Sequence, residues 1–122
     1  MSSSTASLAP TDAGHTYVVP EAKGGFAIPT DLLIADKWTA GTGGKRIDVL
    51  NPSTGEVLTS VADATVADGL SAVDAAAAAA ASWAATPPRA RATVLQRCFQ
   101  SMLEHADWLA QIISLENGKA LP

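Results

Sequence analysis

Few side chains in this sequence have the types and spacing that catalysis needs. The single thiol, Cys98, is the natural candidate for a nucleophile. A reactive cysteine needs an electropositive, partly exposed setting that lowers its pKa. Cys98 instead lies between Leu95 and Phe99 on the apolar stripe of an expected helix, where a thiol behaves as a small apolar side chain. The pattern therefore predicts a buried, structural cysteine.

The two histidines and two neighbouring arginines show no pattern that is typical of a site. His15 lies in a polar N-terminal stretch, and His105 lies near an expected junction between helices, which favours a capping or surface position. Together with Cys98 and the acidic residues, they lack the spacing of a zinc site. Arg89 and Arg91 are expected on a solvated helix face or in salt bridges at an interface.

A glycine-rich segment, GTGGK at residues 41–45, looks like a phosphate-binding loop at first sight. The P-loop pattern needs a glycine at the position of Thr39 and a serine or threonine at the position of Arg46. The dinucleotide-binding pattern also fails, because it needs a glycine where Arg46 stands. A plain hairpin turn is the better interpretation, since glycines favour tight hairpin connections.

Glu116 lies in the last turn of an expected helix, directly before an Asn-Gly pair. A carboxylate is unfavourable there, because the helix dipole is negative at that end. We therefore expect Glu116 to have a compensating partner. A basic side chain in a salt bridge is favoured over a bound cation.

Strands are expected to position the residues in the first half of the chain. Residues 32–38 (LLIADKW) form a short strand candidate, the glycines at 41–44 form a turn, and residues 45–50 form an alternating strand. The sequence NPSTG at 51–55 is a second turn, and residues 56–62 alternate again. The pattern predicts three antiparallel strands.

Three helices are expected to follow. Thr65 with Asp68 three residues later resembles a capping box, and small apolar residues then recur at helical spacing through an alanine run. Thr86 is expected to cap the next helix, with Pro87 at its first position. Apolar stripes continue, with one expected break, to Gly118, which we expect as a left-handed cap.

Composition excludes several classes of partner. The chain has 122 residues and a net charge of −4, and its few lysines and arginines are scattered. A nucleic acid or an anionic membrane surface would need clustered basic side chains. No apolar stretch approaches the roughly 20 residues of a membrane span, and the N-terminus has no secretory or transit pattern. With a single cysteine, a reducing, cytoplasmic location is expected.

Four short segments appear in an order that resembles one enzyme family. They are LIADKW at 33–38, NPSTGEV at 51–57, the alanine-rich helix that ends in SW at 82–83, and LENGK at 115–119. In this order they resemble the N-terminal part of the NAD(P)-dependent aldehyde dehydrogenase superfamily. Within it, the succinate-semialdehyde dehydrogenases are most similar, through MLEH at 102–105, LA at 109–110 and LENGKAL at 115–121.

The resemblance implies a domain organisation and a fold. Residues 1–25 lie before the resemblance, and their Ser-, Thr-, Ala-, Gly- and Pro-rich composition predicts a flexible tail. Residues 26–122 are expected to be the incomplete N-terminal part of an aldehyde dehydrogenase domain. The fold expected is an α/β fragment, with N-terminal antiparallel hairpin strands followed by three helices that pack on the cofactor domain.

The resemblance also implies chemistry that this chain does not complete by itself. Members of the family oxidise an aldehyde to a carboxylate: a cysteine attacks the carbonyl, hydride passes to NAD or NADP, and a glutamate activates water. Those residues and the cofactor-cradling segments come later in the family than the end of this chain, and Cys98 does not match the nucleophile's position. We expect no catalytic and no cofactor-binding residue here, and a small aldehyde, succinate semialdehyde, as the substrate of the full-length protein.

The resemblance implies a metal site and partners as well. In some members a monovalent cation is bound by the backbone just before the Asn-Pro pair and by the acid of the Glu/Asp-Asn-Gly-Lys run. The matching residues here are Val49, Leu50 and Glu116. Glutamate replaces the aspartate of some members, which changes the ligand distance. The expected partner is the remainder of the aldehyde dehydrogenase chain, and family members are homo-oligomers.

A second class of function stays open. The chain is either a truncated aldehyde dehydrogenase or a stand-alone, non-catalytic helical module that binds a partner through exposed apolar stripes. Burial of apolar surface stabilises by about 25 cal/mol per Å², whereas ordering each residue costs about 1–2 kcal/mol. An alanine-rich core leaves little surplus, so we expect the isolated chain to be poorly folded or self-associating.

Overall fold

The computed structural model describes residues 14–19 and 27–121. In this part of the chain, short strands pair as three two-stranded antiparallel sheets, and three helices follow. The strands are β1 (Thr16–Val18), β2 (Ala27–Pro29), β3 (Leu32–Ile34), β4 (Lys37–Thr39), β5 (Arg46–Leu50) and β6 (Val57–Ala62). The helices are α1 (Val66–Ala85), α2 (Pro88–Glu104) and α3 (Ala106–Asn117). The expected α/β fragment, with hairpin strands before three helices, is confirmed.

Strand β1 lies within the stretch that is predicted to be a flexible tail. It pairs antiparallel with β2, with Tyr17 opposite Ile28, and the adjoining Val19 is fully buried. The rest of the predicted tail and the predicted start of the domain, at 1–13 and 20–26, lie outside the described residues. The boundary between tail and domain therefore stays a prediction.

The segment 32–38 is not the single strand that its apolar character predicts. β3 and β4 form a tight hairpin of their own, with Ile34 opposite Lys37. The two turn residues, Ala35 and Asp36, have left-handed φ angles of 51° and 64°, which is the backbone of a type I′ turn. Such turns usually have Asn or Gly at both positions, so this one has a weak sequence signal.

Strands β5 and β6 form the second predicted hairpin, which closes through the turn at 51–55. The pairing runs from Arg46 opposite Ala62 to Leu50 opposite Val57, and it contains a β-bulge near the turn. These two strands are confirmed. They do not join the earlier hairpin in one three-stranded sheet, because each hairpin pairs only within itself.

Helix α1 begins where the sequence predicts. The Thr65 hydroxyl accepts a hydrogen bond from the Asp68 amide at 3.2 Å, and the Asp68 carboxylate accepts one from the Thr65 amide at 2.8 Å. This reciprocal pair is the predicted capping box, which satisfies two amides near the start of the helix. The alanine run then extends the helix to 20 residues, because alanine has the highest helix propensity.

The break between α1 and α2 falls one residue later than predicted. Pro87 is the N-cap of α2, and Pro88 stands at its first helical position. Thr86 is the C-cap of α1, and its hydroxyl donates to the Ser82 carbonyl at 3.0 Å. The predicted role of Thr86 as an N-cap is therefore wrong, although prolines do start the second helix as expected.

The last two helices meet and end at the predicted places. His105 separates α2 from α3, and its ring stacks on Trp108 with the ring centroids 4.7 Å apart. Gly118 ends α3 with a left-handed φ of 68°, and its amide donates to the Ser114 carbonyl at 2.9 Å. Both the break at His105 and the cap at Gly118 are confirmed.

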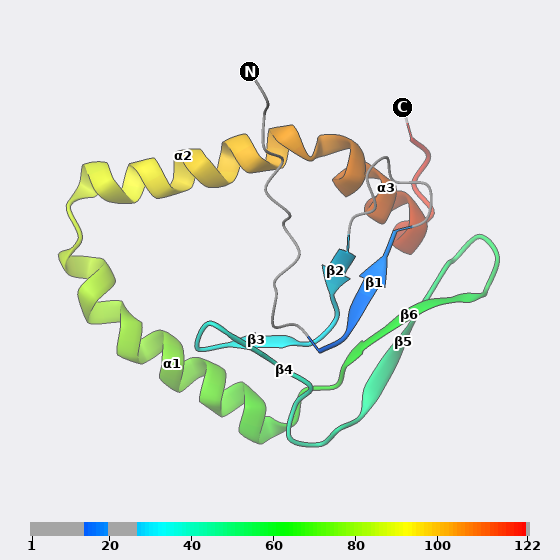
Figure 1. Cartoon of the computed structure of the whole chain (residues 1–122), viewed down its shortest axis with the longest axis horizontal. Helices are drawn as coiled ribbons and strands as arrows, with labels where there is room; N and C mark the ends of the chain where they lie inside the picture. The colour runs from blue at the N-terminus through cyan, green and yellow to red at the C-terminus, as the bar shows by residue number, and fades with distance from the viewer. Residues whose placement is uncertain (1–13, 20–26, 122) are drawn as a thin grey trace.

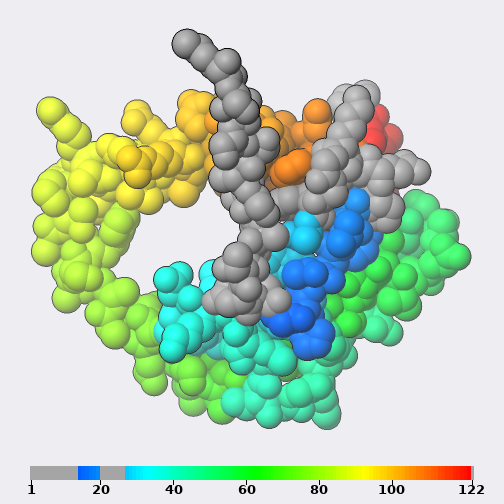
Figure 2. Space-filling view, in the orientation of Figure 1, coloured from blue at the N-terminus to red at the C-terminus, as the bar shows by residue number. Residues whose placement is uncertain are grey.

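The three helices form an open frame along two sides of the strands, and the β5–β6 hairpin lies on the side that no helix covers (Figure 1). In Figure 2, open space passes through the molecule between α1, α2 and the β3–β4 hairpin. Within the described residues, the buried apolar side chains are Val19 and Ala62, and none lies on α2 or α3. The large exposed side chains of these two helices, here called the apolar face, are Val94, Leu95, Phe99, Met102, Leu103, Leu109 and Ile113. No described helix has the length and hydrophobicity needed to cross a membrane.

Candidate functional site

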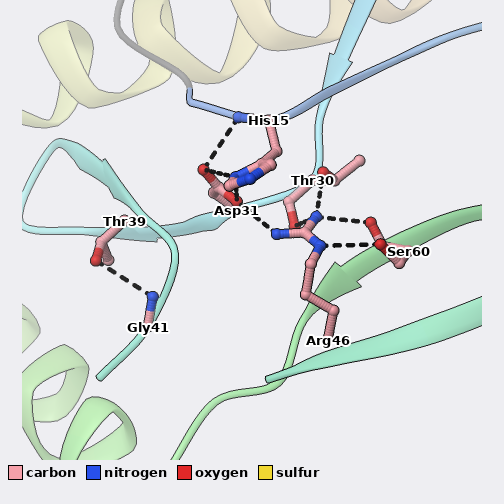
Figure 3. A network of polar contacts seen from close by, with 7 residues as sticks. All are labelled: His15, Thr30, Asp31, Thr39, Gly41, Arg46 and Ser60. Carbon is pink, nitrogen blue, oxygen red and sulfur yellow. Dashed lines mark hydrogen bonds and ion pairs between the residues drawn. The ribbon is translucent and has the colours of Figure 1, made fainter. Parts of the chain in front are cut away.

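Polar contacts gather where the β1–β2 and β5–β6 hairpins meet (Figure 3). The Asp31 carboxylate is 3% exposed and lies 2.9 Å from Nη1 of Arg46 and 3.0 Å from Nδ1 of His15. Nη2 of Arg46 donates to Oγ1 of Thr30 at 2.6 Å and to the Ser60 carbonyl at 2.7 Å. Arg46 of β5 therefore joins Thr30 and Asp31, which follow β2, to Ser60 of β6.

This network holds Asp31 in its ionised form. Burial by itself would raise the pKa of the Asp31 carboxyl, but the hydrogen bonds from Arg46 and His15 outweigh burial and lower the pKa below 3.8. Oδ1 is bonded to both of these side chains, and Oδ2 accepts from the His15 amide at 3.2 Å. Asp31 is thus suited to connecting segments and poorly suited to moving a proton.

The glycine segment at 41–44 connects β4 to β5, which are not paired with each other. Its interpretation as a hairpin turn is therefore wrong. The Asp68 carboxylate accepts hydrogen bonds from the Thr42 amide at 3.1 Å and from the Thr42 hydroxyl at 3.2 Å. A carboxylate of the chain thus takes the amide that a phosphate group would need. The residues of this loop do not fit the phosphate of a dinucleotide.

Asp68 combines two structural roles. The Thr65 amide is the largest cause that lowers the pKa of the Asp68 carboxyl below 3.8, and the Thr65 hydroxyl and both Thr42 groups act in the same direction against burial. The first role, in the helix cap, is predicted from the spacing of three residues. The second role joins positions 26 residues apart, and no local pattern in the sequence indicates it.

Cys98 is exposed on α2, so the prediction of a buried thiol is wrong for this chain. Its neighbours on the stripe, Leu95 and Phe99, are exposed as well. The stripe forms as predicted, but no described element packs against it. A cysteine nucleophile is activated by a hydrogen bond to a histidine or by a nearby basic side chain. Within the described residues, Cys98 has no such hydrogen bond.

Arg91 has a role that the sequence pattern missed. Its Nη1 donates to the carbonyl oxygens of Ala84 and Thr86 at 3.1 and 3.0 Å. A cation at the carbonyl end of a helix is favourable with the dipole, so Arg91 caps α1 from the first turn of α2. The prediction that Arg91 lies on a solvated helix face or in a salt bridge is therefore wrong. Arg89 is exposed on α2, as predicted.

The residues of the predicted cation site lie near one corner of the molecule. A Cβ atom on Gly118 would lie 3.2 Å from Cγ of Pro52, so the end of α3, which contains Glu116, contacts the turn after Val49 and Leu50. Glu116 is exposed and forms no salt bridge with the described residues. The salt bridge to a basic side chain that the sequence favours is therefore not found among them. The described residues include no group of three or more metal-binding side chains. The cation site, which would use two backbone carbonyls, stays a prediction.

Residues 38–122 match the model of the aldehyde dehydrogenase family. This match spans well over half of the chain, so the chain belongs to the aldehyde dehydrogenase family. The family expected from the sequence is confirmed.

Relatives with assigned activities include several aldehyde dehydrogenases. Phenylacetaldehyde dehydrogenase of Pseudomonas fluorescens is 39% identical over 99 residues, which are 80% of this chain and 20% of that protein. The NADP(+) succinate-semialdehyde dehydrogenase GabD of Escherichia coli is 40% identical over 89 residues, which are 73% of this chain and 18% of that protein. The chain therefore spans about a fifth of the length of these relatives.

Solved structures agree with this likeness. An NADP-dependent enzyme of E. coli superimposes with a TM-score of 0.70 at 38% identity, over 71% of this chain and 18% of that one. Succinate-semialdehyde dehydrogenase from Burkholderia pseudomallei gives a TM-score of 0.65 at 33% identity, over 67% of this chain and 17% of that one. The arrangement of hairpins and helices is thus that of a small part of an aldehyde dehydrogenase.

Proposed function

We propose that the chain is the N-terminal part of an NAD(P)-dependent aldehyde dehydrogenase, and that further residues supply the catalytic cysteine, the catalytic glutamate and the cofactor-binding segments. The observation that carries this proposal is the family match over 38–122 in a chain that spans about a fifth of its relatives. The apolar face of α2 and α3 supports it, because exposed apolar surface of this extent marks an interface.

The proposed role of this chain is to cover and brace the cofactor domain. When bound to the whole enzyme, NAD or NADP would accept hydride from the substrate. The residues of this chain would not take part in the hydride transfer and would instead hold structural elements together. Arg46 and Asp31 hold the hairpins together, Asp68 holds the loop at 41–44 on α1, and Arg91 fixes α1 against α2.

For the whole enzyme we propose a small acidic semialdehyde, such as succinate semialdehyde, as the substrate. Several relatives support this class: the succinate-semialdehyde dehydrogenase of E. coli, a malonate-semialdehyde dehydrogenase of Geobacillus kaustophilus at 43% identity, and a glutarate-semialdehyde dehydrogenase of Pseudomonas aeruginosa at 38% identity. Phenylacetaldehyde is the competing substrate, because a phenylacetaldehyde dehydrogenase is about as similar.

We further propose that the carbonyls of Val49 and Leu50 and the carboxylate of Glu116 bind a monovalent cation in the whole enzyme. The contact of Gly118 with Pro52 supports this, since it brings the two segments to one corner. A cytoplasmic location and a homo-oligomer complete the proposal. The location is favoured because a single thiol cannot form an internal disulfide.

The test is to express the full-length protein and to measure NADH or NADPH formation with a panel of aldehydes. We expect the highest kcat/KM with succinate semialdehyde, and lower values with phenylacetaldehyde. A preference for phenylacetaldehyde would contradict the substrate and leave the family standing. The absence of NAD(P)H formation with every aldehyde would contradict the proposed activity.

A stand-alone binding module is the second candidate, and the same apolar face is the observation that favours it. The two candidates differ in what covers this face: the rest of the same chain, or a separate protein. An isolated chain that folds cooperatively would favour the module.

A further inference from the structure

Asn117 and Gly118, at the C-terminal end of α3, form a dipeptide that can modify itself. The asparagine amide is a thermolabile group. It is most reactive before a glycine, because a residue without a Cβ does not obstruct the approach of its own amide nitrogen to the asparagine side chain. Asn117 is the last residue of α3, and both residues are exposed. The two groups that react are therefore adjacent in the chain and accessible to water.

The reaction of this pair needs water as its only co-reactant. The Gly118 nitrogen loses its proton and forms a bond to Cγ of Asn117. The bond from Cγ to Nδ2 breaks, and the side-chain nitrogen takes up a proton and leaves as ammonia. One water molecule then opens the resulting five-membered succinimide at either of its carbonyls. The product is aspartate, or isoaspartate, in which the main chain runs through Cγ.

The C-cap of α3 opposes the first step. The Gly118 amide donates to the Ser114 carbonyl at 2.9 Å, so its proton is held and its nitrogen is directed along the helix. The cap also lies close to the turn after β5, because a Cβ on Gly118 would be 3.2 Å from Cγ of Pro52. The nitrogen can reach Cγ of Asn117 only when the last turn of α3 opens. Helix ends open more readily than the rest of a fold.

We propose that Asn117 is a site of spontaneous deamidation, and that the opening of the α3 C-cap sets its rate. The product favours further opening. A new carboxylate at position 117 lies beside Glu116 at the negative end of the helix dipole, which is unfavourable. Isoaspartate lengthens the main chain by one carbon, so the Gly118 amide no longer has the spacing of a helical hydrogen bond. A transient opening is thereby converted into a permanent loss of the cap.

A second dipeptide that can form the same ring, Asp68 and Gly69, is protected more strongly. The Gly69 amide donates to the Thr65 carbonyl at 3.0 Å within the first turn of α1. Ring closure at an aspartate requires the protonated carboxyl, since the oxygen must leave as water. Hydrogen bonds from the Thr65 amide and hydroxyl and from Thr42 hold the pKa of the Asp68 carboxyl below 3.8. Of the two sites, the one at Asn117 is therefore the one that reacts.

The experiment follows deamidation in the full-length protein by peptide mapping and mass spectrometry, in mildly alkaline buffer and in guanidinium chloride. We expect Asn117 to react under both conditions, at least about tenfold more slowly in the folded protein. The other asparagine, Asn51, is the internal control, because the Pro52 that follows it has no amide proton. Equal rates for the folded and unfolded protein would overturn the proposal. Absence of the reaction at Asn117 in the folded protein would overturn it as well.

Two proline variants test whether the cap itself sets the rate. Pro52→Ala removes the ring that lies beside Gly118. It should raise both the deamidation of Asn117 and the hydrogen exchange of the Gly118 amide by about two- to fivefold, because both reactions need the same opening. Pro88→Ala, at the first position of α2, should change neither rate. A rise in amide exchange without a matching rise in deamidation would overturn the control by the cap.

Discussion

Asp31 and Asp68 each join segments that are far apart in the sequence, and each is almost fully buried. Both carboxylates accept several hydrogen bonds in their ionised form, which lowers the pKa of each below 3.8. Perturbed carboxylates often mark active sites. Here the hydrogen-bond donors to both carboxylates come from a helix cap, a loop and hairpin strands. The lowered pKa values of these two residues therefore reflect structural contacts and do not mark an active site.

The first prediction concerns acid stability. Because the pKa of Asp31 is lower in the folded state than in the unfolded state, its stabilisation is present above about pH 4 and is lost as the pH falls through the folded pKa. In the full-length protein, Asp31→Asn should reduce the hydrogen-exchange protection of β2 at neutral pH and should flatten the dependence of this protection on pH below about pH 4. Asp74→Asn is the control, since Asp74 is exposed on α1. An Asp31→Asn protein with the acid dependence of the unmodified protein would contradict this role.

Among single residues, those with local partners could be predicted from the sequence. The spacing of Thr65 and Asp68 predicts the capping box, because both partners lie in one helical turn. Arg46 could not be predicted as the centre of a network, because its partners Thr30 and Ser60 are 16 and 14 residues away. The burial of Cys98 could not be predicted for a related reason: an apolar stripe indicates which side of a helix can be buried, but burial needs a partner, and no described element packs against Cys98.

At the scale of elements, the ends of helices could be predicted from residues close by in the sequence, whereas the pairing of strands could not. Gly118 ends α3 because a left-handed φ is tolerated best by glycine. The β3–β4 hairpin, in contrast, turns through Ala35 and Asp36, two residues that rarely adopt positive φ together. Strand β1 lies in a sequence without periodicity and forms because β2 and Asp31 hold it.

The second prediction compares two glycines. Gly118→Ala should destabilise α3 by about 1 kcal/mol or more, because of its φ of 68° and the 3.2 Å contact of the new Cβ with Pro52. Gly69→Ala in α1 meets no atom within 4 Å and should stabilise α1 by about 0.5–1 kcal/mol. Native-state hydrogen exchange of the two helices in the full-length protein measures both changes. Equal effects at the two positions would show that neither the backbone angle nor the contact matters.

At the scale of the whole molecule, the open frame of helices is the central feature (Figure 1). Among the described residues, the buried apolar side chains lie at the ends of β1 and β6, and no described element covers the apolar face of α2 and α3. Under the function proposed above, further residues of an aldehyde dehydrogenase chain pack against this face.

The third prediction uses Cys98 as a reporter of that packing. In the isolated chain, at a concentration where sedimentation shows a monomer, the exposed thiol should react with a thiol reagent at a rate near that of a free cysteine. In the full-length protein, the reaction should be at least about tenfold slower, because covered thiols are inert. Equal rates in the two proteins would show that the α2 face stays open.

The most direct test of the account is the thermal unfolding of residues 1–122 alone, followed by circular dichroism in a sample whose mass is known from sedimentation. Three helices without a covering sheet have too little buried apolar surface to offset the ordering of the chain. We therefore predict a broad, non-cooperative loss of helix, or self-association through the apolar face. A sharp, cooperative transition from a monomer would contradict the account and would favour a stand-alone module.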